Sequence, residues 1–332
     1  ALVIDEAHNF RHLNSKRSHY MHLYSDEFEY RYLLSATPAV NHFEYWFPQM
    51  RILDPSILRQ SHKRFIETIG SKVGTTYDRW AVKEYNVQQI QFVRGQMAPY
   101  VIRRLKKDDP DMKVQKYTQP VYFEMNPKHR MIYEFVVNYE EYFAESAEKS
   151  NITVQSLKAK LPYTLMALED PARLRKSLGL TDDPLTDDDV ARIKALPEDF
   201  VSGAESLLRD WTEGMDSRFD WLDSLVDKVV NYEGEKLIIF DHRPNILNYM
   251  VARYSEHQPL VIHGQLPVKD KYKYREEVVH RFNDRSNDNR IACLSSLTSS
   301  AGLNLQEGGR YIALFNLPLD TTHFYQLGER TY

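Results

Sequence analysis

The chain has 332 residues, of which 42% are hydrophobic and 27% charged, and its formal net charge is −4. This length allows two ordinary hydrophobic cores, so we expect a globular protein of about two domains. The slightly acidic balance excludes a chain that coats nucleic acid through overall basicity, but not a local basic groove. No signal-like leader and no apolar run near about eighteen residues occurs, which predicts an intracellular protein without membrane contact.

The first forty residues predict a small piece of a parallel sheet. Leu2 to Ile4 and Tyr32 to Leu34 are apolar runs that predict two buried strands, and the His- and Tyr-rich segment between them predicts a helix. Two strands do not make a stable parallel sheet. We therefore expect an incomplete lobe, with earlier strands cut away at Ala1 or encoded in sequence that precedes it.

Acidic and hydroxyl residues follow both of these strands. Asp5, at the carboxyl end of the first strand, can hold a Mg²⁺ ion that bridges nucleotide phosphates, and Glu6 can orient and deprotonate the attacking water. The alternative for this Asp-Glu-Ala-His segment is an acidic helix cap. Ser35 and Thr37 follow the second strand in a short Ser-Ala-Thr segment. Taken alone, this segment could be part of a functional motif or an ordinary turn.

The middle of the chain combines a basic patch with helices. Residues 103–107 contain two arginines and two lysines, a basic cluster suited to contact with phosphate. A solvated basic turn is the alternative, because it has the same composition. Helices are predicted from Asn126-Pro127 onwards and from 216 to 232, with Gly234 as a stop. The aspartate-rich segment between them predicts a helix start near Thr186 rather than a metal site, because it lacks the glycine and distal glutamate of a calcium loop.

The last hundred residues predict a second parallel sheet. Apolar runs at 237–240, 260–262, 290–294 and 311–315 alternate with helical patterns, one of which begins at Pro244. Such alternation predicts a parallel sheet covered on both faces, with ligands at the carboxyl ends of its strands. The single cysteine, Cys293, has apolar neighbours, so we expect a buried, unreactive thiol and no disulfide.

Seven segments in chain order resemble motifs II to VI of the SWI/SNF-type ATPases, which are DEAH-box, helicase-like members of superfamily two. They are DEAH, SAT at 35–37, QMAPYVIRRLKKD, KLIIFDHRPNILNYM, VIHGQLPVKDKYKYREEVVHRFND, LSSLTSSAGLNLQ and QLGERTY. The resemblance departs from the family at Ser299 and Ser300, which replace a usual glycine pair, and at LPLDTTHF, which replaces a Trp-Asn-Pro. A plain polar loop is the alternative for the serine-rich segment.

The resemblance implies an α/β fold with two RecA-like parallel-sheet lobes, the first incomplete, and helical insertions. Residues 1–118 are expected to form the C-terminal part of the first ATPase lobe with a helical protrusion. Residues 119–234 are expected to start the second lobe and to contain a helical insertion. Residues 235–332 are expected to form the second RecA-like lobe.

The resemblance also implies the cofactors, ATP and Mg²⁺, and the residues that act on them. Expected catalytic residues are Glu6, Gln326 and Arg330. Expected cofactor-binding residues are Asp5, which also holds the metal, Glu6, Gly302, Asn304 and Arg330. Expected coupling residues are His8, Ser35 and Thr37. Expected nucleic-acid contacts are Arg103, Arg104, Lys106, Lys107, Ser295, Ser296 and Thr298.

Two parts of an ATP site are missing from the sequence. No G-x-x-x-x-G-K-[ST] segment occurs, and by the family pattern a second arginine of motif VI is expected just beyond Tyr332. We therefore expect this segment alone to hydrolyse ATP barely or not at all.

Three functional interpretations remain open. The favoured one is an ATP-dependent translocase of the chromatin-remodelling type that moves on duplex DNA through backbone contacts; nucleosomes or protein subunits are further implied partners. Its location is expected to be nuclear in a eukaryote and otherwise cytoplasmic. The alternatives are a DEAH-type RNA helicase and a degenerate, non-hydrolysing module that binds nucleic acid or partner proteins.

Overall fold

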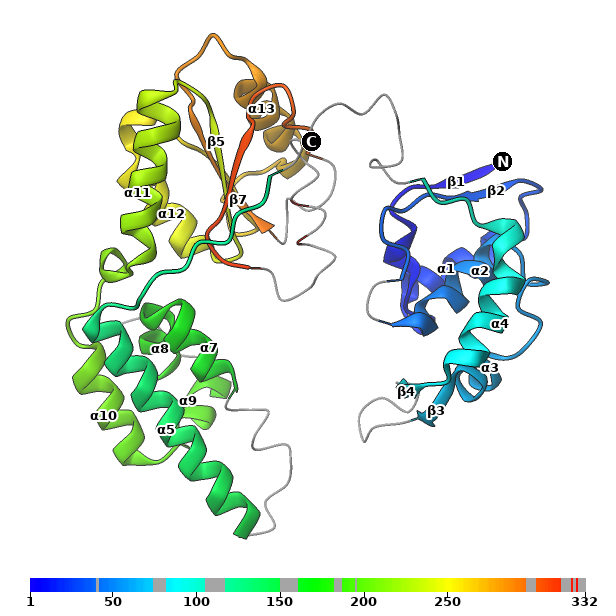
Figure 1. Cartoon of the computed structure of the whole chain (residues 1–332), viewed down its shortest axis with the longest axis horizontal. Coiled ribbons are helices and arrows are strands. Elements are labelled where there is room, and N and C mark those ends of the chain that lie inside the picture. Colours follow the sequence, from blue (N-terminus) through cyan, green and yellow to red (C-terminus); the bar gives the residue numbers. More distant parts are fainter. Residues whose placement is uncertain are drawn as a thin grey trace. The chain divides into compact units, whose positions relative to one another are not determined.

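The computed structural model describes residues 1–39, 42–73, 82–104, 117–149, 161–181, 187–194, 196–296, 303–317, 324 and 327. The chain divides into two compact units, the first extending to Gln115 and the second beginning at Lys116 (Figure 1). The three-part division expected from the sequence stays a prediction. No helix among the described residues is long and apolar enough to cross a membrane.

The first unit contains a two-stranded parallel sheet. Strand β1 (Leu2–Ile4) pairs with β2 (Arg31–Leu33), and the predicted helix α1 (Lys16–Ser25) lies between them in sequence. The expectation that these strands are buried is wrong for one face. Val3 is 61% exposed and Tyr32 54%, because side chains alternate along a strand and only the other face packs onto the core beside Ile4.

Short helices form the rest of the first unit. They are η1 (Ala7–Phe10), η2 (Phe43–Tyr45), α2 (Trp46–Leu53), α3 (His62–Ile69), α4 (Val87–Met97) and η3 (Ala98–Tyr100), together with the antiparallel strands β3 (Gly70–Val73) and β4 (Val82–Tyr85). The apolar faces of α2, α3 and α4 meet in one core around Phe47, Phe65 and Ile66. Each such side chain contributes about 1.5–3 kcal/mol on burial.

The second unit begins with a helical bundle. Its helices are α5 (Pro127–Lys149), α7 (Leu161–Glu169), α8 (Pro171–Ser177), α9 (Asp187–Lys194) and α10 (Glu198–Leu208). The predicted cap at Asn126 is confirmed, since its side-chain oxygen accepts the His129 N–H at 2.8 Å. Helix α9 begins at Asp187; the predicted start at Thr186 lies outside the described residues.

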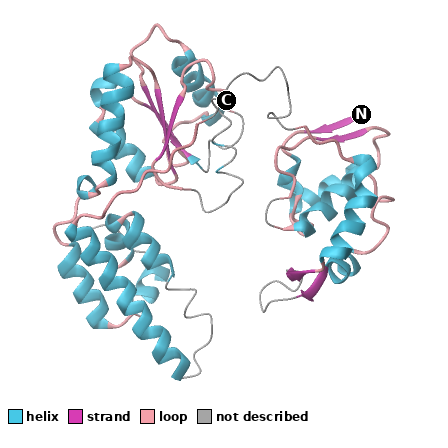
Figure 2. Ribbon diagram, viewed as in Figure 1, coloured by secondary structure: helices cyan, strands magenta, loops and turns pink. Residues whose placement is uncertain are grey.

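The rest of the second unit is a four-stranded parallel sheet with its covering helices (Figure 2). Its strand order is β6 (Leu260–Ile262), β7 (Ile291–Ser295), β5 (Leu237–Asp241) and β8 (Tyr311–Leu314). The helices and turns of this part are η5 (Glu213–Met215), α11 (Arg218–Val226), η6 (Asp227–Tyr232), α12 (Pro244–Arg253), η7 (Ser255–His257) and α13 (Lys271–Asn283).

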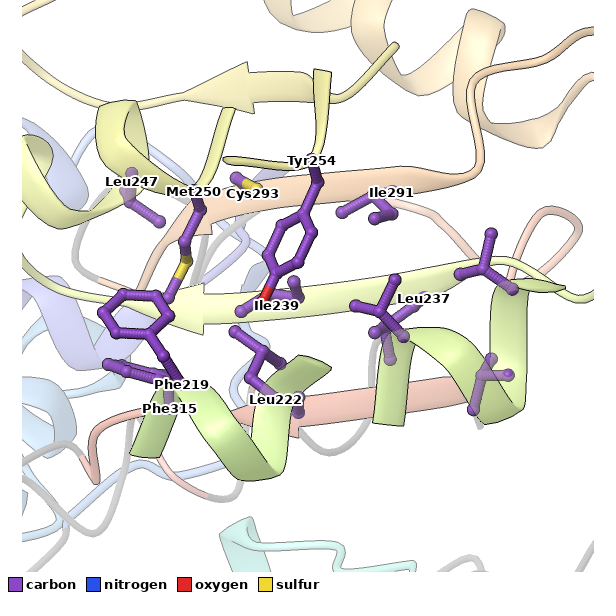
Figure 3. Close-up of a cluster of buried hydrophobic side chains, with 14 of the residues drawn as sticks. Phe219, Leu222, Leu237, Ile239, Leu247, Met250, Tyr254, Ile291, Cys293 and Phe315 are labelled. Atoms are coloured by element: carbon purple, nitrogen blue, oxygen red, sulfur yellow. The ribbon is translucent and has the colours of Figure 1, made fainter. Parts of the chain in front are cut away.

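Both faces of this sheet are covered. On one face, β5, β7 and β8 pack against α11 and α12 through side chains that include Phe219, Leu237 and Met250 (Figure 3). On the other face, Phe240 packs against Phe282 of α13. The predicted α/β class is confirmed, because parallel strands alternate with helices that cover both sides of the sheet.

Two local predictions in the second unit are also confirmed. Gly234 ends the helical segment with a left-handed φ of 66°, a conformation that glycine adopts without steric cost. The last turn before it, η6, is a π-helix, which the sequence pattern did not predict. Cys293 is fully buried, and burial raises the pKa of its thiol to about 12.

Candidate functional site

The two carboxylates predicted to act on nucleotide follow β1 directly. The Asp5 carboxylate is exposed and its Oδ1 accepts the Glu6 N–H at 2.8 Å. Glu6 has a φ of 50°, in the left-handed region, which costs a non-glycine residue about 1–2 kcal/mol. Such strain is often stored where a side chain must be aimed at a ligand. Both carboxylates therefore lie at the carboxyl end of a parallel strand, where α/β folds bind ligands.

A chain of polar contacts joins Glu6 to the segment after β2. The Nδ1 atom of His8 lies 3.3 Å from Oε2 of Glu6 and 3.2 Å from Oγ of Ser35. A His8 tautomer with its hydrogen on Nδ1 donates to both oxygens. The Thr37 N–H donates to Ser35 Oγ at 3.2 Å. The structure thus brings the predicted catalytic Glu6 and the predicted coupling residues His8, Ser35 and Thr37 together.

The pairing of β1 with β2 explains this convergence. Ile4 lies opposite Leu33 in the parallel register, so both strands end at the same edge. The Leu34 N–H donates to the Ile4 carbonyl at 2.8 Å, and the Ala7 N–H donates to the Leu34 carbonyl at 2.9 Å. The Thr37 hydroxyl is buried there and has no hydrogen-bond partner within the described part of the chain.

The donor set at this edge fits magnesium shared with a phosphate. Among the residues that the structure describes, no group of three or more His, Cys, Asp and Glu side chains converges to hold a metal. Magnesium in nucleotide sites needs only one or two protein carboxylates, because phosphate oxygens and waters complete its octahedron. Asp5, with Glu6 beside it, offers this number of hard oxygen ligands.

The predicted nucleic-acid residues of the first unit lie after η3. Arg103 and Arg104 are exposed, and neither guanidinium has a hydrogen bond or ion pair within the described residues. Their neighbours Lys106 and Lys107 lie outside those residues. Two adjacent arginines at the surface provide positive charge that suits a phosphate backbone.

The predicted residues of the second unit lie near the end of β7. Ser295 ends the strand and Ser296 follows it, and their exposed fractions are 3% and 2%. Asn304 is exposed, and its side-chain oxygen accepts the Gln306 N–H at 3.3 Å. The remaining predicted residues lie outside the described part of the chain: Thr298, Gly302, Gln326 and Arg330.

A buried ion pair at the end of β5 was not predicted from the sequence. Nε and the backbone N–H of Arg243 donate to Oδ1 of Asp241 at 2.9 and 2.7 Å, and Nη2 donates to Oδ2 at 2.6 Å. Arg243 is 2% exposed and Asp241 fully buried. The available signal was an aspartate directly after an apolar strand, the same pattern that marks Asp5.

Two arginines connect this strand end to the helical bundle. Arg243 and Arg218 both donate to the backbone carbonyl of Glu169, at the end of α7. Arg218 is itself paired with Asp216, its Nε donating at 2.9 and 3.0 Å. Because the α7 terminus leaves carbonyls without helical partners, the two guanidinium groups satisfy it and fix the bundle to the sheet.

His242, between the members of the ion pair, completes this junction. Its Nε2 lies 3.6 Å from Oε2 of Glu169, and its Nδ1 lies 3.4 Å from the side-chain nitrogen of Asn316, after β8. Burial lowers the pKa of His242 below its usual 6.5. The junction therefore brings together residues from α7, β5 and the end of β8.

Paired carboxylates at the end of a parallel strand are compatible with the class of α/β nucleotide-binding folds, which bind ligands at this edge of the sheet. A model of the SNF2-related domain family matches residues 1–171, and the chain belongs to that family. The resemblance to SWI/SNF-type superfamily-two ATPases, predicted from the motifs, is thereby confirmed.

Similar proteins include three curated relatives. A SWI/SNF-related regulator of chromatin containing a DEAD/H box, from Caenorhabditis elegans, is 23% identical over 94% of this chain and 33% of its own length. The transcription regulatory protein SNF2 of Saccharomyces cerevisiae is 22% identical over 92% of this chain and 17% of its own length. The DNA repair and recombination protein RAD54 of the same yeast is 21% identical over 94% of this chain and 33% of its own length. The chain thus spans a third or less of these relatives.

Solved structures show weaker similarity. The C-terminal part of the Fun30 ATPase domain is 16% identical, with a TM-score of 0.44 over 65% of this chain and 80% of that one. The SWI2/SNF2 ATPase core of Sulfolobus solfataricus in complex with double-stranded DNA is 18% identical, with a TM-score of 0.39. The match covers 95% of this chain and 57% of that one. The fold class therefore rests on the parallel sheets of the chain itself.

Proposed function

We propose that this chain is a segment of an ATP-dependent motor that moves on duplex DNA. The observation that carries the proposal is the contact chain from Glu6 through His8 to Ser35. It links a carboxylate suited to water activation to the segment that follows the next strand. Membership of the SNF2-related family and the names of the relatives, which describe chromatin regulation, transcription and DNA recombination, support the same proposal.

In the proposed reaction, Asp5 and Glu6 act at the end of β1. Bound magnesium would neutralise charge on the phosphates of ATP as the terminal phosphoryl group leaves. Asp5 is the residue that would hold this ion, because its carboxylate is exposed. Glu6 would orient a water and accept its proton. His8 keeps the Glu6 carboxylate in place, since its Nδ1–H contacts both Glu6 and Ser35.

Residues of the second unit are also proposed to act on ATP. Gly302, Asn304, Gln326 and Arg330 are assigned to nucleotide by the family pattern, with Gln326 and Arg330 acting on the transferring phosphoryl group. An arginine in that role contributes about three to five orders of magnitude in rate. Since the chain contains no G-x-x-x-x-G-K-[ST] segment, we place hydrolysis in the full-length protein and expect little from this segment alone.

DNA binding is proposed to use backbone contacts from both units. Arg103 and Arg104, with Lys106 and Lys107, would contact phosphates in the first unit. Ser295, Ser296 and Thr298 are assigned to the second. Contacts to phosphates carry little sequence information and depend strongly on salt. By the same inference the protein acts in the nucleus if its organism is a eukaryote and in the cytoplasm otherwise, with nucleosomes or protein subunits as further partners.

The test is ATP hydrolysis by the full-length protein that contains this segment, with duplex DNA, single-stranded DNA or RNA added. Glu6→Gln is the control variant, expected to bind ATP but not to hydrolyse it. Stimulation by duplex DNA that disappears in Glu6→Gln supports the proposal. Stimulation by RNA alone favours an RNA helicase. A rate that is indifferent to every polymer and to Glu6 contradicts the proposal and favours a non-hydrolysing binding module.

A further inference from the structure

A hollow of about 370 Å³ lies in the first unit between α1, α2 and the start of α3. Its volume is in the range of sites that bind small ligands or parts of larger ones. The polar side chains that line it are Asn14, His19, His22, Arg51, Ser61 and His62, and Leu13 and Phe47 supply its apolar wall. None of the residues assigned above to ATP or DNA lines this hollow.

The lining is basic and contains no carboxylate. Arg51 is exposed, and its guanidinium has no hydrogen bond or ion pair within the described residues. Asn14 and His19 are exposed beside it. Because a guanidinium presents several N–H donors in a planar fork, Arg51 suits an anion with several acceptor oxygens.

The wall of the hollow is held in place by backbone contacts. His22 lies with Nδ1 2.6 Å from the carbonyl of Ser18, on α1, and Nε2 3.2 Å from the carbonyl of Pro48, on α2. A neutral His22 ring donates to one of these two carbonyls, and a protonated ring donates to both. The ring of His62 packs against Phe47, with ring centroids 5.1 Å apart. His22 and His62 therefore connect the elements around the hollow through contacts to backbone carbonyls and to Phe47.

Helix α3 adds an unusual charge pattern to this hollow. It begins with His62, Lys63 and Arg64 and has no acidic residue in its first turn. The N-terminus of a helix carries partial positive charge, so cations there are unfavourable and an anion is favourable. Ser61 caps the helix by accepting the Arg64 N–H at 3.3 Å, but it neutralises no charge. Lys63 is paired with Glu67 one turn further on, at 3.9 Å, and an anion in the hollow would be attracted by Arg51 and by the start of α3.

We propose that this hollow binds a phosphate group, with Arg51 as its main donor and with Asn14, His19 and the first turn of α3 around it. The phosphate belongs either to a nucleic-acid backbone or to a free phosphate compound, since both present the same oxygens. Only the nucleic-acid source rests on the proposed function. In that case the hollow is a third DNA contact, separate from Arg103 and Arg104.

The test compares two substitutions in the full chain. Arg51→Gln removes the guanidinium from the lining. Arg17→Gln is the matched control, because Arg17 is an exposed arginine of α1 outside the lining, two residues from His19, and residues two apart on a helix face different directions. His19→Gln is a second variant on the lining. All three side chains are exposed, so we expect each variant to fold, and circular dichroism is the check.

The first measurement is a titration with inorganic phosphate, followed through the histidine ring resonances by NMR. The expected result is a saturable shift of the His19 and His62 resonances that Arg51→Gln weakens about tenfold or more and Arg17→Gln leaves unchanged. The second is duplex-DNA binding as a function of salt. If the backbone is the source, Arg51→Gln lowers the slope of log K against log salt by about 0.9, the value of one phosphate contact.

The outcomes separate the sources from each other and from the proposed function. Weaker binding of both probes by Arg51→Gln supports a DNA contact. Loss of phosphate binding alone supports a site for a free phosphate compound. If the wild-type chain binds phosphate but no DNA, the proposed DNA motor loses support while this inference stands. If Arg51→Gln and Arg17→Gln behave alike with both probes, the inference is wrong.

Discussion

The imidazole of His8 lies 3.2 Å from the hydroxyl of Ser35, 27 residues further along the chain. The same ring nitrogen lies 3.3 Å from the carboxylate of Glu6. In the tautomer with its hydrogen on Nδ1, His8 donates to a carboxylate at the end of β1 and to a hydroxyl after β2. We propose that a movement of the Ser35 segment reaches Glu6 through this imidazole, and that a change at Glu6 reaches Ser35 by the same contacts.

We expect His8→Ala in the full-length protein to separate nucleotide binding from its response to DNA. The substitution removes the imidazole that contacts both Glu6 and Ser35, but it removes none of the residues proposed to bind ATP. ATP affinity should change little, while stimulation of hydrolysis by duplex DNA should fall about fivefold or more, the size of a typical coupling energy. The measurement is steady-state hydrolysis with and without DNA, beside direct binding of labelled ATP.

Ser35→Ala, alone and combined with His8→Ala, tests whether His8 and Ser35 act through their shared contact. The double variant should be no worse than either single one, because both remove the same interaction. His12→Ala is the control, because it removes a neighbouring imidazole whose ring packs edge-on against Tyr45, with ring centroids 5.1 Å apart. Additive losses from His8 and Ser35 would mean that they act separately.

The burial of the Arg243–Asp241 ion pair predicts a large loss of stability when Arg243 is replaced by an uncharged residue. Arg243→Met leaves the Asp241 carboxylate buried without its partner, which typically costs about 3–5 kcal/mol of unfolding free energy. Arg253→Met is the matched control: Arg253 pairs with Asp223 at a partly exposed site, where such a pair contributes about 0–1 kcal/mol. Urea denaturation followed by circular dichroism gives both values. Similar midpoints for the two variants would contradict the burial seen at β5.

The local part of the fold could be predicted from the sequence. Apolar runs identified the strands near Leu2, Leu237, Leu260, Ile291 and Tyr311, and Asn126 and Gly234 identified helix ends, because each signal lies within a few residues of its effect. The order of the four strands and the exposure of Val3 depend on what packs against each element. That information lies in contacts between distant segments.

The same division holds for the candidate sites. Asp5 and Glu6 were predicted because a strand followed by carboxylates is a local pattern with a known chemistry. The junction of Arg243 and Arg218 was missed, since the acceptor that they share is a backbone carbonyl at Glu169, which has no sequence signature. The hollow around Arg51 was missed for a related reason: three helices contribute to it and none of its residues forms a motif.

Buried histidines predict that stability falls in mild acid. His129 is 3% exposed, its Nε2 lies 2.9 Å from the carbonyl of Ala167, and burial lowers its pKa below 6.5. The unfolded chain therefore binds the proton first as pH falls. The stabilisation is complete above about pH 6.5 and is lost as pH decreases toward the folded-state pKa. Burial also lowers the pKa of His22, His242 and His263.

His129→Gln should reduce this pH dependence. One proton fewer is taken up on unfolding, so the slope of unfolding free energy against pH should fall by up to about 1.4 kcal/mol per pH unit in that window. Urea denaturation between pH 5 and 8, with wild type and variant compared at each pH, gives the slope. Equal slopes would mean that His129 does not remain neutral in the folded chain.

Close packing of the segment after β7 against α13 predicts opposite effects for two glycine substitutions. A Cβ atom on Gly308 would lie 2.4 Å from the backbone carbonyl oxygen of Phe282 and 2.7 Å from its ring. A backbone atom cannot move aside as a side chain can, so Gly308→Ala should cost about 1–3 kcal/mol. Gly95, inside α4, has nothing within 4 Å of such an atom. Gly95→Ala should therefore stabilise its helix by about 0.5–1 kcal/mol. Thermal unfolding followed by circular dichroism should show a lower melting temperature for Gly308→Ala and an equal or higher one for Gly95→Ala. A Gly308→Ala variant that melts like wild type would place Gly308 away from Phe282 and contradict the packing of this segment on α13.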